Sequence, residues 1–107
     1  MSSTPSVTPR WLTAGLTRVF AAAGLSDRAA ATVAEALVDA DLRGIPSHGA
    51  MLTPMYVDRL RRGSVTTAER AEVVVDAGAV AVLDAGHAMG VLTGDQAMAL
   101  AVAKAHE

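Results

Sequence analysis

The interior of this chain must be built almost without aromatic side chains. Apolar residues make up 51% of the 107 residues, but there is only one Trp, one Tyr and one Phe. The core must therefore be filled by Ala, Val, Leu and Met, and such small side chains favour close packing of helices over aromatic clusters. The length suits one small domain.

The charge balance argues against a nucleic-acid partner. Nine Lys and Arg residues stand against eleven Asp and Glu residues, which gives a formal net charge of -2. The one basic cluster, residues 59–62, falls at the predicted C-terminus of a helix, where cations complement the helix dipole. We therefore expect no basic face that could hold a phosphate backbone.

The composition gives no sign of export or of a membrane partner. The chain has no cysteine, so it has no disulfide framework and no thiolate metal site, which fits a reducing compartment. It has neither an unbroken apolar window of membrane-spanning length nor the basic and apolar regions of a signal peptide. We expect a cytoplasmic protein.

The N-terminal half is predicted to be helical. Residues 1–8 are rich in Ser, Thr and Pro and are predicted to be disordered. Thr8 is placed to cap a first helix that ends at Gly24, and Ser26 is placed to cap a second, alanine-rich helix that ends near Gly44.

The segment Asp41–Gly49, with the sequence DLRGIPSHG, directly follows the second helix. Ile45 and Pro46 force a chain reversal there, next to the hydroxyl of Ser47 and the imidazole of His48. If Ser47 caps a third helix, His48 lies in its first turn, where free amides and the dipole favour a substrate carboxylate. An imidazole can also serve as an acid, a base or a hydrogen-bond donor. The alternative is a simple cap followed by an exposed first-turn histidine.

The third helix is predicted to continue up to Gly63. Pro54 either kinks it or starts a second short helix that Thr53 caps. Tyr56 follows His48 by eight residues, about two helical turns, so its phenol could reach the same substrate. The alternative for Tyr56 is a core tyrosine with its hydroxyl at the edge.

The remaining histidines carry no predicted site. His87 lies between glycines and is typical of a turn, and His106 has no partner at metal-ligand spacing, so we predict no metal site. Residues 86–94 contain glycines but do not match a phosphate-binding fingerprint. We therefore assign no cofactor-binding residue within this chain.

The C-terminal half is predicted to contain a β-hairpin and a helix. The valine-rich runs 73–75 and 80–83 flank a turn near Asp76–Gly78, and a helix follows from Val91. Both strands are apolar on both faces, and such strands normally lie inside a larger covered sheet. The fold class is therefore α/β, mostly helical with a β-hairpin, and we expect the chain to be the N-terminal portion of a longer polypeptide.

Taken in order, these residues resemble the N-terminal part of the malate/L-lactate dehydrogenase family, which is unrelated to the Rossmann-type lactate dehydrogenases. The resemblance runs from Leu12 to the end of the chain. It rests mainly on residues 40–49 and on Tyr56, with weaker support from residues 82–84. It implies that residues 9–107 form the N-terminal part of a non-Rossmann dehydrogenase fold, truncated before the cofactor-binding region.

The resemblance also implies an activity. Such enzymes use NAD or NADP to interconvert 2-hydroxy acids and 2-oxo acids, some relatives reduce a cyclic imino acid or oxidise ureidoglycolate, and most are homodimers. Carried onto this chain, Ser47, His48 and Tyr56 would bind the substrate, and His48 would be a candidate catalytic residue. A second catalytic histidine is expected beyond the C-terminus, so the 107-residue chain alone is expected to be inactive.

The chain departs from the family pattern at one position, and two other functions are compatible with the sequence. Many relatives carry an arginine four residues after the histidine, which suits bidentate carboxylate binding, whereas this chain has Leu52. The exact substrate is therefore open. The chain could instead be a stand-alone helical interaction module, or a degenerate relative that acts as a regulatory subunit.

Overall fold

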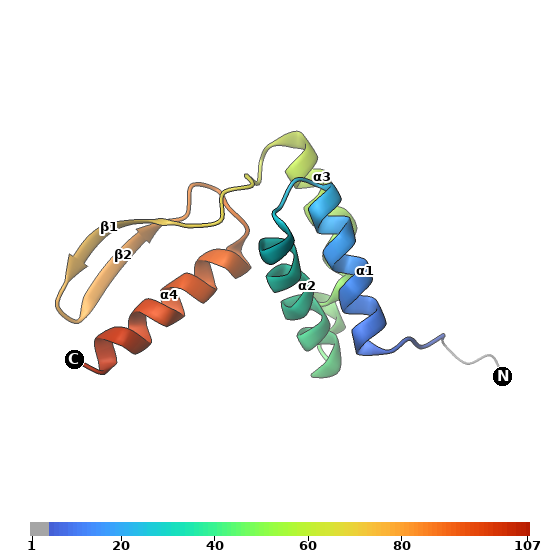
Figure 1. Cartoon of the computed structure of the whole chain (residues 1–107), viewed down its shortest axis with the longest axis horizontal. Helices are drawn as coiled ribbons and strands as arrows, with labels where there is room; N and C mark the ends of the chain where they lie inside the picture. The colour runs from blue at the N-terminus through green and yellow to red at the C-terminus, as the bar shows by residue number, and fades with distance from the viewer. Residues whose placement is uncertain (1–4) are drawn as a thin grey trace. The chain divides into compact units, whose positions relative to one another are not determined.

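The computed structural model describes residues 5–107, and its helices and strands confirm the predicted α/β class (Figure 1). Two compact units, residues 1–57 and 58–107, divide the chain within its third α-helix. The elements in order are α1 (Pro9–Ala22), α2 (Asp27–Leu42), the 3-10 turns η1 (Pro46–His48) and η2 (Ala50–Leu52), α3 (Thr53–Arg62), β1 (Glu72–Ala77), β2 (Val80–Asp84) and α4 (Gly90–Ala105).

The predicted disordered tail, residues 1–8, lies partly outside the described residues. Residues 5–8 belong to no helix or strand, and α1 begins at Pro9. None of the helices among residues 5–107 combines the length and the apolar character that crossing a membrane requires.

Side-chain caps start helices α1 and α2, as predicted. Thr8 Oγ1 accepts a hydrogen bond from the Trp11 N–H (3.1 Å) at the start of α1, and Ser26 Oγ accepts one from the Ala29 N–H (3.1 Å) at the start of α2. Each bond satisfies an amide that has no partner inside its own helix. Gly24, with φ 116°, reverses the chain between the helices.

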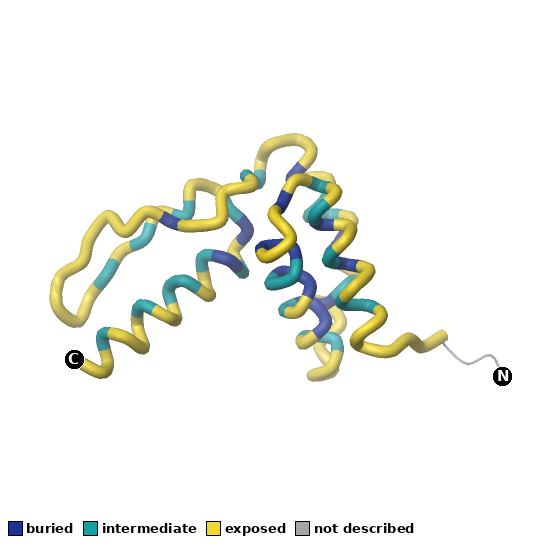
Figure 2. The backbone as a smooth tube through the Cα atoms, in the orientation of Figure 1, coloured by how far each residue is buried: buried dark blue, intermediate teal, exposed yellow. Residues whose placement is uncertain are grey.

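The core of the first unit lies where α1 and α2 pack together. Phe20 and Val33 are fully buried, and alanines on α2 leave room for the two backbones to approach. Figure 2 shows that buried positions are concentrated along α2. The buried apolar residues of these helices and their connection are Leu16, Phe20, Leu25, Ala29, Ala30, Val33, Ala34, Leu37 and Val38.

Of the two alternatives for the third helix, a kink at Pro54 or two short helices, the structure is closer to the second, but the part before α3 is not an α-helix. Two separate 3-10 turns, η1 and η2, precede α3, because Gly49 between them is extended (φ -100°, ψ -153°) and interrupts the helical hydrogen bonds. Pro54 is the second residue of α3, a position where its missing N–H has no helical partner to lose. The predicted end of this helix at Gly63 (φ 79°) is confirmed.

The predicted hairpin is confirmed in the second unit. Strands β1 and β2 pair in antiparallel fashion, with a bulge at Val74, and a two-residue loop joins them. The loop is Gly78–Ala79, so Asp76, which was predicted in the turn, belongs to β1. Gly78 has φ 59°, as the first position of a type II′ turn requires. The strand valines remain 42% to 58% exposed.

Side chains from α4 tie this helix to the hairpin and to the segment before it. Lys104 Nζ donates to the Asp76 carboxylate and to the Gly78 carbonyl oxygen (2.7 Å). The Gln96 amide accepts from the Ala71 N–H (2.7 Å) and donates to the Ala71 carbonyl (3.0 Å). The predicted C-terminal helix is thus confirmed, beginning at Gly90.

Candidate substrate site after the second helix

The candidate site begins where α2 ends in a Schellman motif. The Ile45 N–H donates to the Ala40 carbonyl (2.9 Å), and the Gly44 N–H donates to the Asp41 carbonyl (3.0 Å). Gly44 has φ 76°, a conformation that residues with a Cβ rarely adopt. The end of α2 therefore fixes the direction in which the chain enters the loop.

Ser47 and His48 form a hydrogen-bonded pair on this loop. Both lie in η1 and both are exposed, with 2.9 Å between Ser47 Oγ and His48 Nδ1. Because Nδ1 is engaged, the ring turns Nε2 away from Ser47, and Nε2 has no hydrogen-bond partner within residues 5–107. Nε2 donates a hydrogen bond when Ser47 donates to Nδ1, and accepts one when Nδ1 carries the proton.

Two expectations for these residues are corrected. Ser47 does not cap a helix, since its hydroxyl contacts the His48 ring and Ile45 holds the N-cap position of η1 without a side-chain bond. His48 is the last residue of a three-residue turn, not part of the first turn of an α-helix. The predicted stabilisation of an anion by a helix dipole therefore does not apply to His48, because such a dipole needs several aligned peptides.

Tyr56 and Leu52 follow in the same unit. Tyr56 is half-buried in α3 and Leu52 is half-buried in η2. His48 and Tyr56 therefore belong to different elements, and their spacing of eight residues is not two turns of one helix. A shared pocket for these residues stays a prediction.

The predicted cap at Thr53 is also wrong. Thr53 has helical dihedral angles (φ -54°, ψ -48°) and is the first residue of α3. Its Oγ1 is buried and has no hydrogen-bond partner among the described residues. Helix α3 begins directly after η2, so no extended capping residue separates the two elements.

The carboxylate of Asp41 was not among the groups predicted for this site. Asp41 Oδ2 accepts a hydrogen bond from the Ala50 N–H (2.9 Å), which closes the loop around Ser47 and His48. An acidic residue in the last turn of a helix was the available signal, because the dipole disfavours negative charge there. Gly49, directly after His48, was the second signal, because a residue without a side chain leaves room for a neighbouring group such as this carboxylate.

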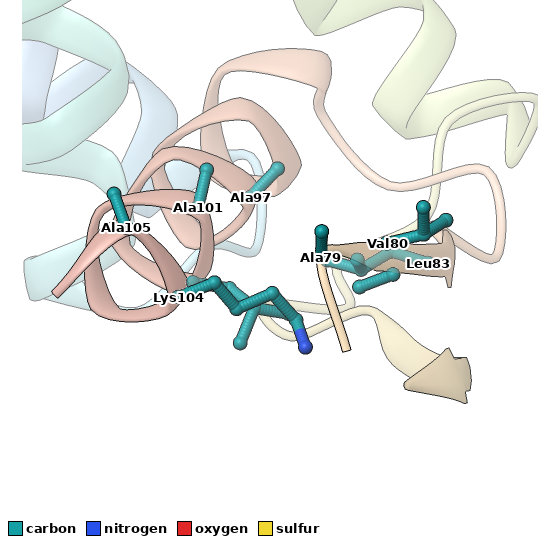
Figure 3. A pocket seen from close by; sticks show the side chains of 9 residues that line it. Ala79, Val80, Leu83, Ala97, Ala101, Lys104 and Ala105 are labelled. Atoms are coloured by element: carbon teal, nitrogen blue, oxygen red, sulfur yellow. The ribbon is translucent and has the colours of Figure 1, made fainter. Parts of the chain in front are cut away.

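The second unit holds a groove between β2 and α4 (Figure 3). Its volume is about 470 Å³, and small apolar side chains line it, with Lys104 at one side. The lining residues are Ala79, Val80, Ala81, Leu83, Ala97, Leu100, Ala101, Lys104 and Ala105. This lining has little hydrogen-bonding capacity, so it suits an apolar neighbour better than a hydroxy acid.

The glycine-bearing segment after β2 uses its polar groups internally. The Gly86 N–H donates to Asp84 Oδ1 (2.9 Å), and the Gly86 carbonyl accepts from Thr66 Oγ1 (2.9 Å). His87 has φ 59° in this turn, and its carbonyl accepts from the Thr66 N–H (2.9 Å). These groups are not free to hold a dinucleotide. The described residues also contain no group of three or more His, Asp or Glu side chains suited to a metal ion.

Comparison with known proteins agrees with the resemblance seen in the sequence. Residues 7–107 match the malate/L-lactate dehydrogenase family. The chain is 33% identical over 88 residues to the malate/(S)-sulfolactate dehydrogenase of Methanothermus fervidus, covering 82% of this chain and 26% of that protein. It is 37% identical over 89 residues to hydroxycarboxylate dehydrogenase B of Escherichia coli O157:H7, covering 83% of this chain and 25% of that protein.

Solved structures show the same relationship. The sulfolactate dehydrogenase of Methanocaldococcus jannaschii superposes with a TM-score of 0.90 and 31% identity, covering 94% of this chain and 29% of that one. The chain thus spans about a quarter of the length of these relatives. Sequence and fold together show that this chain belongs to the malate/L-lactate dehydrogenase family.

Proposed function

We propose that this chain supplies part of the substrate pocket of an NAD- or NADP-dependent dehydrogenase that interconverts 2-hydroxy acids and 2-oxo acids. Membership of the family supports the dehydrogenase reaction. The observation that carries the site assignment is the exposed Ser47–His48 pair, which leaves His48 Nε2 available to a ligand.

The chemistry of such a substrate fits this pair. The oxygen on C2 loses a proton when the hydroxy acid is oxidised and gains one when the oxo acid is reduced. In our proposal His48 Nε2 hydrogen-bonds to that oxygen, and Ser47 holds the ring through Nδ1. Tyr56 lines the same pocket, and a second histidine and the cofactor-binding residues come from outside this chain.

Leu52 supports a narrower proposal on specificity. An apolar side chain cannot bind a carboxylate as an arginine at this position would. We propose that the substrate carboxylate is held by other residues and that an apolar part of the substrate lies next to Leu52. The complete enzyme is proposed to be a homodimer.

The test is a chimera. The N-terminal segment of E. coli hydroxycarboxylate dehydrogenase B that corresponds to residues 7–107 is replaced by those residues of this chain, and oxidation of 2-hydroxy acids is followed by NADH or NADPH absorbance. A second chimera uses the M. fervidus enzyme as the host. We expect activity from the chimeras and none from the 107-residue chain alone.

His48→Ala in the active chimera is expected to lower kcat/KM on the order of 100-fold, the range of a lost proton-transfer or hydrogen-bonding group. The matched control is His106→Ala, because His106 is exposed at the end of α4. Two folded, cofactor-binding chimeras without activity would contradict the proposed function. Equal activities of the His48 and His106 variants would contradict the assignment of His48 to the substrate pocket.

A further inference from the structure

We propose that Asp41 is a positioning residue, which fixes the Ser47–His48 pair through the backbone of the loop that carries it. The role of the pair in substrate binding rests on the function proposed above. The effect of Asp41 on the loop does not, because it follows from contacts within residues 41–50.

The first observation is a hydrogen bond across the loop. Asp41 lies in the last turn of α2, and its Oδ2 accepts from the Ala50 N–H at 2.9 Å. The bond joins the two ends of the segment that contains Ser47 and His48. A carboxylate bound to an amide forms one of the stronger hydrogen bonds in proteins, so it restrains this loop more than a neutral pair would.

The second observation is that the loop fits closely around the carboxylate. Gly49 is buried, and a Cβ placed on it would lie 2.7 Å from Asp41 Oδ2 and still closer to Oδ1 and Cγ. Its dihedral angles (φ -100°, ψ -153°) are open to other residues, so the missing side chain leaves room for Asp41 and does not relieve backbone strain. The residue after His48 is thus shaped to accept this carboxylate.

The third observation is that Asp41 has an unfavourable position in its own helix. The dipole disfavours an acidic group at a helix C-terminus. Asp39, two residues earlier, is paired with Arg43 (2.9 Å), whereas the Asp41 carboxylate has no partner within residues 5–107 other than the Ala50 amide. Among the described residues, the contact to the loop is the one that compensates this position.

A double-mutant cycle in the 107-residue chain tests the loop contact. Asp41→Ala is expected to speed hydrogen exchange of the Ala50 amide about 10- to 100-fold, the range of a lost hydrogen bond to a charged group, and Asp41→Asn less than about tenfold. Gly49→Ala should also speed this exchange in the wild type. In the Asp41→Ala background Gly49→Ala should add less than about twofold, because the clashing carboxylate is gone.

Kinetics in the chimera test the positioning role. Asp41→Ala is expected to lower kcat/KM on the order of 10- to 100-fold, as displaced site residues do. Asp41→Asn should retain most of the kcat/KM of the unsubstituted chimera. In a His48→Ala background Asp41→Ala should have no further effect on kcat/KM. Asp39→Ala, which removes an exposed ion pair from the same helix, is the matched control and should leave kcat/KM unchanged.

The outcomes separate this proposal from the proposed function. Additive effects of the Asp41 and Gly49 variants on Ala50 exchange would overturn the loop contact, whatever the activity. A purely structural role would lower the melting temperature of Asp41→Ala without a change in kcat/KM, and would overturn the positioning role. A coupled cycle in the 107-residue chain, together with chimeras that show no activity, would support the loop contact and reject only the proposed function.

Discussion

Among single residues, the Ser47 hydroxyl is the group that decides which nitrogen of His48 faces outward. The 2.9 Å contact to Nδ1 holds the ring, although both side chains are exposed and no helix supports them. An exposed imidazole without this contact would turn freely about its side-chain bonds. The pair is therefore ordered by one local bond.

Loss of the Ser47 hydroxyl should weaken the site without abolishing it. Ser47→Ala is expected to lower kcat/KM of the chimera by about fivefold to tenfold, which corresponds to one hydrogen bond of about 1 kcal/mol. It should also change the tautomer ratio of His48 in the ring ¹⁵N spectrum of the 107-residue chain. Ser64→Ala, which removes an exposed hydroxyl at 3.5 Å from the Arg59 carbonyl, is the control. An unchanged ratio would show that Ser47 does not hold the ring.

Specificity can be tested at Leu52. Leu52→Arg is expected to lower KM of the chimera for malate by about tenfold, because a guanidinium can bind, through two hydrogen bonds, the second carboxylate of malate, which takes the place of the apolar part of the proposed substrate. The control is Leu52→Met, which preserves volume and polarity and should cost little. If the arginine variant raised KM for malate instead, the part of the substrate opposite the shared carboxylate would not lie next to residue 52.

The sequence predicted that Ser47 and His48 lie together on the loop after α2, but it did not predict their local geometry. Ser47 and His48 are recognisable from the motif, but the reason given for Ser47, a helix cap, was wrong. The extended Gly49 separates the two 3-10 turns, and the next residue, Ala50, donates to the carboxylate of Asp41, nine residues before it. Such a contact across a loop cannot be derived from local periodicity.

Among the elements, α1 and α2 are the best determined by local chemistry. Each begins at a side-chain cap and is followed by a glycine with positive φ, and each buries one apolar stripe. Their boundaries could be predicted because caps, proline and glycine act within one turn of the chain. The start of α3 could not, because no comparable cap separates it from η2.

The contribution of the α1 cap to the stability of the chain can be measured. Thr8→Ala is expected to lower the free energy of unfolding by about 1 kcal/mol, because the Trp11 N–H loses its acceptor. Thr13→Ala is the control in the same helix, since its hydroxyl bonds only to the Pro9 carbonyl and alanine is the better helix former. Urea unfolding of both variants is the measurement. An equal loss of unfolding free energy in both variants would contradict a stabilising role of the Thr8 cap.

In the molecule as a whole, burial is uneven between the two units. Helix α2 has six buried residues, whereas the strand valines stay 42% to 58% exposed and the groove beside α4 is apolar. The sequence predicted these doubly apolar strands and their need for a cover. The residues that would cover these strands could not be predicted from this sequence. The chain spans only about a quarter of the length of its relatives.

This difference predicts the pattern of hydrogen exchange in the 107-residue chain. Amides in the middle of α2 should exchange slower than those of β1 and β2, because a two-stranded hairpin with exposed side chains is marginal in water. Thermal unfolding should accordingly be broad. Equal protection of α2 and the hairpin, with a sharp melt and one defined oligomer, would instead favour a stand-alone interaction module.

The most direct test of the central claim is a crystal structure of the chimera with a bound 2-oxo acid. The Ser47–His48 pair should keep its hydrogen bond, and His48 Nε2 should lie about 2.7 to 3.2 Å from the oxygen on C2 of the ligand. An ordered ligand in the active site that contacts neither Ser47 nor His48 would contradict the claim that this loop forms part of the substrate pocket.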